Sequence, residues 1–216
     1  MERTVRVVGT GRMNVRPDLI AVSLSISSKN KDEAKAMAES AGLMEALRDS
    51  LAPLGFEPSA LKTVSFNVNA EYDSVREGGV YKNVFSGYSV RHGLKLEFGF
   101  DTELLSRVLS AVTGCIAEPE VNVGFTVRDR DGISSELLTI AVRDARERAK
   151  VLAEASGVSL GRLLSIEYGG NEPDFVSPTR FAANARLSLK AAPVDMAVEP
   201  EDIRLTENAV LVWEIL

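Results

Sequence analysis

The chain has 216 residues, of which 45% are hydrophobic and 26% charged, as in an ordinary globular protein with one large domain or two small ones. Its formal net charge of −6 argues against a nucleic-acid partner, because binding to phosphates needs concentrated Lys and Arg. The single cysteine, Cys115, cannot form an internal disulfide and fits a reducing compartment.

The opening residues MERTVRVVGTG lack the apolar segment of a secretory signal. No run approaches the roughly 18 apolar residues that a membrane-spanning helix needs. We therefore expect a cytoplasmic protein without a membrane span. The periplasm or envelope is the alternative if a signal was removed.

The first half of the chain predicts long strands around one helix. Two strands are expected in residues 4–29, and the second alternates apolar residues with small ones, a pattern that buries one face. A helix follows over about residues 31–52, with Asn30 and Glu33 placed as a capping box. Two alternating strands, 62–72 and 83–98, then predict a hairpin too long for one short helix to cover.

The second half contains the longest helical signal, in residues 129–161, which the rest of the chain is expected to surround. Its apolar stripe is rich in alanine, so the helix can lie very close to a sheet. Asp131 is the expected N-cap, and Gly157 the expected end. Residues 171–193 contain Gly and Pro without periodicity and predict a long loop or mobile arm. The last strand is expected over residues 203–216.

Strands and helices mixed in this order predict an α+β fold, with largely antiparallel sheets and helices packed on one face. We expect one domain over residues 1–216. Two similar, intertwined α+β subdomains are an open alternative, because the first and the last long helix each occupy a strand–helix–strand setting.

Several segments, taken together and in order, resemble the SIMPL-domain family. They are GTGRMNVRPDLIAVSLSI (9–26), LKTVSFNVNAEYD (61–73), SGYSVRHGLKLEF (86–98), NVGFTVRD (122–129), AVRDARERAKVLAEASGVSLGRLLSIEYGG (141–170) and VEPEDIRLTENAVLVWEIL (198–216). The resemblance implies an α+β fold and assembly into ring-like or channel-like oligomers. It also implies a bacterial protein linked to oxidative-stress defence or to an immunogenic envelope protein. It brings no set of catalytic residues.

None of the residues that could carry chemistry forms a recognisable site. Gly9-Thr10-Gly11 lacks the third glycine of a dinucleotide loop, so we expect a bulge or tight bend there. His92 is the only histidine and is expected to be a hydrogen-bonded core or interface residue, not a metal ligand. Cys115 has no neighbouring base and is expected to be structural. We predict no catalytic residue, cofactor or metal.

Three functions remain as hypotheses. The first is a non-enzymatic protein that assembles with copies of itself, because long two-faced strands are usually paired or protected. The second is a small-ligand-binding protein or an unrecognised enzyme, with a site between sheets or protomers. The third is an adaptor that binds a protein partner by strand addition. The candidate ligand or interface residues are Tyr72, Tyr88, Arg91, His92 and Trp213.

Overall fold

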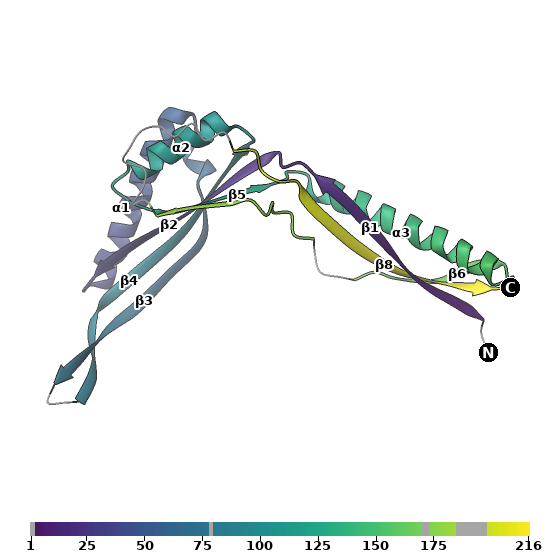
Figure 1. Cartoon of the computed structure of the whole chain (residues 1–216). Helices are drawn as coiled ribbons and strands as arrows, with labels where there is room; N and C mark the ends of the chain where they lie inside the picture. The colour runs from purple at the N-terminus through teal and green to yellow at the C-terminus, as the bar shows by residue number, and fades with distance from the viewer. Residues whose placement is uncertain (1–2, 78–79, 170–172, 185–197) are drawn as a thin grey trace. The chain divides into compact units, whose positions relative to one another are not determined.

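A computed structural model gives the fold and describes residues 3–77, 80–169, 173–184 and 198–216 (Figure 1). The chain forms two compact units, each built from separate segments. Unit 1 contains residues 1–18, 126–178 and 200–216, and unit 2 contains residues 19–125 and 179–199. Both units combine antiparallel strands with helices, so the predicted α+β class is confirmed.

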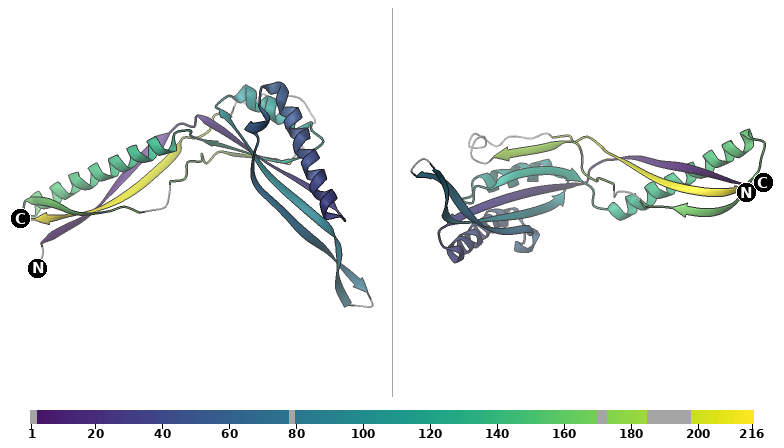
Figure 2. Two further views of the ribbon diagram at one scale, coloured as in Figure 1. Left: turned by 180° about the vertical axis from the view of Figure 1, so that it is seen from behind. Right: turned by 90° about the horizontal axis from the view of Figure 1, so that it is seen from below.

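Unit 1 is a three-stranded sheet covered on one face by one long helix. The strand order is β1–β8–β6, with β1 at Thr4–Val15, β8 at Ile203–Ile215 and β6 at Leu160–Glu167. The helix α3, Arg130–Ala155, packs along β1 and β8 (Figure 2). Its buried residues recur every four positions, and all but the first are alanine: Leu137, Ala141, Ala145, Ala149 and Ala153.

The glycines of β1 allow this close packing. A Cβ on Gly9 would overlap the carbonyl oxygen of Ala141, and one on Gly11 would overlap that of Leu137. The pairing of β1 with β8 runs through both glycines without a register shift. The predicted bulge or bend is therefore wrong. Glycine is needed here because the backbone of the helix touches the backbone of the strand.

Unit 2 has a five-stranded sheet in the order β3–β4–β2–β5–β7, with two helices. The segment from β2 to β5 follows the β-α-β-β-α-β order, and its strand order is that of a ferredoxin-like split βαβ unit. β7 adds to the outer edge of β5. The elements are β2 (Leu19–Asn30), α1 (Glu33–Leu51), η1 (Ala52–Leu54), η2 (Pro58–Ala60), β3 (Lys62–Glu77), β4 (Val80–Gly99), α2 (Thr102–Thr113), β5 (Glu120–Thr126) and β7 (Arg180–Asn184).

The core of unit 2 lies between the sheet and its helices. The alternating apolar residues of β2 and β4 point to this side, as their period of two predicts. The small residues of β2 face the other way, and Ser23 and Ser27 are exposed there. The main buried side chains of the core are Ile20, Val22, Leu24, Ile26, Leu47, Leu94, Leu96, Val123 and Phe125.

Two helix starts differ from their predicted positions. Asp32 caps α1, while Asn30 accepts a hydrogen bond from the backbone N–H of Asp32. Asp129, not Asp131, caps α3. Asp101 caps α2, where its side chain accepts a hydrogen bond from the backbone N–H of Leu104. Where several Asp or Asn residues lie close together before a helix, each could serve as the N-cap. The local backbone geometry then decides which of them does.

Part of the predicted loop at 171–193 is also wrong. Residues Arg180–Asn184 form β7 and pair with β5 from Glu120 to Gly124. Backbone groups alone supply this ladder, so the segment needs no hydrophobic alternation. Residues 171–172 and 185–193 lie outside the described part of the chain.

Candidate functional site on the β3–β4 ribbon

The β3–β4 hairpin extends far beyond the sheet that it starts from (Figure 1). β2 pairs with β4 only from Tyr88 to Gly99. From Ala70 on, β3 pairs with the part of β4 that reaches from Tyr88 out to Val80, past the end of β2. We call residues 70–77 and 80–88 the ribbon. A two-stranded ribbon is at best marginally stable in water, so this one needs internal contacts or a covering surface.

Aromatic rings line one face of the ribbon. Phe85 packs edge-on against Tyr72 at 5.8 Å and against Tyr88 at 5.2 Å between ring centroids. Nearer the turn, the guanidinium of Arg76 lies 5.9 Å from the ring centroid of Tyr81. These contacts stiffen the ribbon but do not bury it, since Tyr72 is 60% and Tyr81 68% exposed. An exposed row of large rings is typical of an interaction surface.

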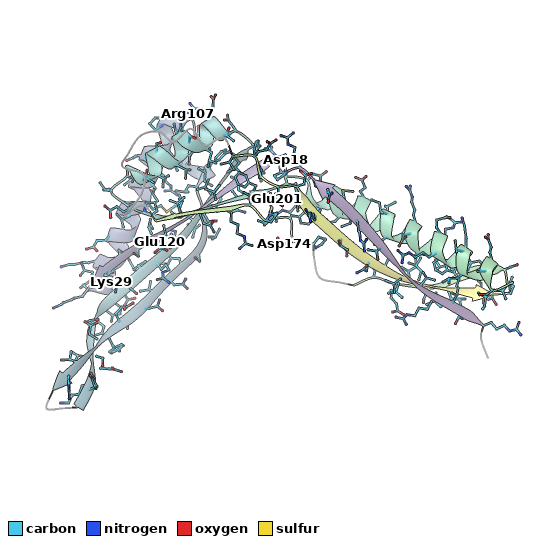
Figure 3. The ribbon with its side chains drawn as sticks, in the orientation of Figure 1. Asp18, Lys29, Arg107, Glu120, Asp174 and Glu201 are labelled. Atoms are coloured by element: carbon cyan, nitrogen blue, oxygen red, sulfur yellow. The ribbon has the colours of Figure 1, made fainter. Side chains whose placement is uncertain are left out.

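The opposite face is polar at the base of the ribbon. Glu71 accepts a hydrogen bond of 2.6 Å from Ser89 and lies 3.6 Å from the ammonium of Lys29. The Ser89 hydroxyl, and after it the charge of Lys29, lower the pKa of Glu71. Figure 3 labels Lys29 at the end of β2. This face therefore carries a charged, hydrated group where the other face carries aromatic rings.

His92 is buried where the ribbon joins the sheet. Its Nε2 lies 2.8 Å from the hydroxyl of Thr63, and its ring packs edge-on against Phe66 at 5.1 Å. Its Nδ1 has no hydrogen-bond partner among the described residues. Burial, and after it the charge of Arg48, lower the pKa of His92. Both effects disfavour the charged form of the imidazole at this position.

We expect the protein to lose stability as the pH falls below the ordinary histidine value of 6.5. Because burial lowers the pKa of folded His92, the unfolded chain takes up this proton first, and protonation favours unfolding. Above pH 6.5 the histidine is mainly neutral in the unfolded chain as well, so protonation of His92 takes no stability from the folded protein there. Urea unfolding between pH 5 and 8, monitored by circular dichroism, measures it. His92→Gln should remove the change in this window, and an equal loss in that variant would contradict the role of His92.

The five residues predicted to bind a ligand or form an interface lie on two faces of unit 2 and in the core of unit 1. Tyr72, Tyr88 and His92 lie on one face, and Arg91 lies on the opposite face with Glu71, because successive strand residues alternate. Trp213 belongs to unit 1, where it packs in the core beneath α3. Within unit 2, Arg91 therefore does not share a face with Tyr72, Tyr88 and His92. Their separate roles in ligand binding or in an interface stay predictions.

Sequence reasoning missed Phe85 and Tyr81, which belong to the same surface. The sequence did contain a sign of this surface. The outer part of the ribbon carries large apolar residues, whereas a hairpin exposed to solvent on both faces would carry polar ones. The register shift between Glu71 and Tyr72 then decides which rings share a face, and pairing alone reveals such shifts.

The described residues offer no assembled metal site: no group of three or more His, Cys, Asp and Glu side chains is placed to hold an ion. Among the same residues, no helix has the length and apolar character needed to cross a bilayer.

Comparison with known proteins agrees with this architecture. The family model for SIMPL, described as a protein of unknown function (DUF541), matches residues 5–213. The chain therefore belongs to the SIMPL family. It is 29% identical to the 26 kDa periplasmic immunogenic protein of Brucella melitensis, over 95% of this chain and 83% of that protein. It is 26% identical to the uncharacterized protein YggE of Edwardsiella ictaluri, over 96% and 84%.

Among solved structures, a phage SAM lyase in complex with S-methyl-5'-thioadenosine matches 52% of this chain and 84% of its own. The identity is 13% and the TM-score 0.28, too low to support any conclusion about this chain.

Proposed function

We propose that this chain is a non-enzymatic protein that assembles with copies of itself into a ring-like or channel-like homo-oligomer through the β3–β4 ribbon. One observation carries the proposal: the ribbon exposes large aromatic side chains along a hairpin that no other strand of the described residues supports. Association with a second copy would cover both the rings and the backbone edge. A role in stress protection is part of the proposal and comes from the family resemblance.

Assembly through a ribbon has two geometric outcomes. A ribbon that pairs with the same ribbon of a second copy closes as a dimer with twofold symmetry. A ribbon that binds a different surface of the next copy forms a ring when the rotation between copies closes, and an open filament when it does not. A solution mass distinguishes the two, because a dimer stops at twice the chain mass of 23.3 kDa.

We expect Phe85→Lys to lower the mass of the assembly. The change places a charge in the middle of the aromatic row, where a partner would have to bury it without a counter-charge. Size-exclusion chromatography with light scattering measures the effect. Ile116→Lys is the matched control, because Ile116 is 81% exposed and lies outside the ribbon. A wild-type monomer at high micromolar concentration would refute assembly.

A protein adaptor that works by strand addition is the second candidate. The observation that favours it is the outer edge of β3, which is the end strand of its sheet. A monomeric wild type that captures a partner protein, and loses it with Phe85→Lys, would support the adaptor in place of the oligomer. A small-ligand site or an unrecognised activity remains a third hypothesis, to be tested by a thermal-shift screen with metabolites.

We propose the periplasm as the location, by analogy with the Brucella relative whose name gives that compartment. The cytoplasm, expected from the sequence, is the alternative. Fractionation of cells that express the native gene, with a marker protein for each compartment, decides between the two.

A further inference from the structure

Unit 1 has an uncovered apolar groove beside its helix. α3 packs on β1 and β8 and hardly reaches β6, the third strand. The pairing of β6 with β8 places Leu163 opposite Trp213 and Ile166 opposite Leu211. Leu163 and Ile166 thus lie on the helix-covered side of the sheet but remain 43% and 54% exposed. The sheet is one strand wider than its single helix can cover.

The groove has the size and lining of a ligand site. Its volume is about 590 Å³, and its walls come from one flank of α3 and from β6. Trp213 and Leu211 of β8 belong to its lining, together with Val142 and Leu160 at its sides. Pockets of this volume with mainly apolar walls commonly hold small molecules. The first requirement for a ligand is therefore an extended apolar part.

The same groove has a positive rim. Arg146 and Lys150 line it from successive turns of α3. The ammonium of Lys150 donates to Glu147 at 2.8 Å. Arg146 is exposed, and its positive charge contributes to lowering the pKa of the neighbouring Glu147. The second requirement is therefore an anionic group, for which a planar guanidinium is well suited.

We propose that this groove binds an anionic amphiphile with a single acyl chain, the chain lying on Leu163 and Trp213 and the carboxylate meeting Arg146. Apolar walls and a cationic rim favour this class over a neutral lipid, which leaves Arg146 unpaired, and over a cationic one, which the rim repels. The site lies in unit 1 and does not involve the β3–β4 ribbon, so the inference goes beyond the proposed self-assembly.

Trp213 is the only tryptophan of the chain, and it reports directly on the groove. We expect decanoate, titrated below its micellar concentration into the full-length protein, to change Trp213 emission saturably. Decyltrimethylammonium should cause no saturable change, and decanol should bind at least about fivefold more weakly, as expected for a lost charged hydrogen bond. Equal binding of the three compounds, or no saturable change with decanoate, would overturn the proposal.

Two variants test the roles of the residues. Arg146→Gln should weaken decanoate binding by about fivefold or more and leave decanol binding unchanged. Arg143→Gln is the matched control, because it removes the same charge from an exposed position of α3 outside the groove. Leu163→Ser should weaken binding of both compounds. Thermal unfolding of each variant shows whether it is folded, and an unchanged decanoate affinity in folded Arg146→Gln would overturn the proposal.

A second copy of the chain is the competing occupant. In that case Trp213 emission would change with protein concentration without any amphiphile, and decanoate would compete with self-association. That outcome would also overturn the proposal. The measurement is repeated with Phe85→Lys, so that assembly through the ribbon does not affect the readout.

Discussion

Gly9→Val is expected to unfold unit 1 or to lower its stability by about 3 kcal/mol or more. The added side chain would overlap the carbonyl oxygen of Ala141 and the backbone nitrogen of Ala145. These are backbone atoms of a helix, and they cannot turn away as the end of a flexible side chain can. Relief would require α3 to move off β1, which would open the alanine-lined interface along its length.

Urea unfolding followed by Trp213 fluorescence measures this loss, because Trp213 lies in the core of unit 1. Gly42→Ala is the control. A Cβ on Gly42 meets nothing within 4 Å, and the residue lies inside α1. Followed by circular dichroism, which also reports on unit 2, that variant should be neutral or more stable by about 0.5 to 1 kcal/mol, since alanine favours a helix. A midpoint for Gly9→Val equal to that of the wild type would show that α3 does not lie on β1 as described.

Leu94→Ala is expected to destabilise unit 2 by about 2 to 5 kcal/mol. Leu94 is fully buried in β4, between the sheet and its helices. Removing its side chain leaves a cavity in a rigid surrounding, because β4 is paired on both sides by β2 and β3. The cost therefore includes both the lost burial and the unfilled space.

Circular dichroism measures the global transition of this variant, and Trp213 fluorescence follows unit 1 alone. Ile116→Ala, at an exposed turn, is the control and should change stability by less than about 0.5 kcal/mol. If the two probes give different midpoints for Leu94→Ala, the units unfold separately. A loss for Leu94→Ala no larger than that of the control would contradict the assignment of Leu94 to the core.

The sequence alone determined the class of fold and the long strands and helices, but it missed β7. Alternation along β2 and β4 predicted which side chains enter the core, and the stripe of α3 predicted a helix that packs closely. These patterns are reliable because each depends only on the local period of a strand or a helix. The family resemblance added the expected architecture over nearly the whole chain.

Only the tertiary structure shows why the glycines of β1 are needed. It also determines which strands are neighbours and which residues share a surface. Gly9 and Gly11 have no local reason to be glycine, and the reason lies more than 100 residues away in α3. The face shared by Tyr72, Phe85 and Tyr88, and the groove at Trp213, depend on how separate strands pair. The register shift between Glu71 and Tyr72 sets which residues of β3 and β4 are neighbours, and the period of a single strand does not record where such a shift falls.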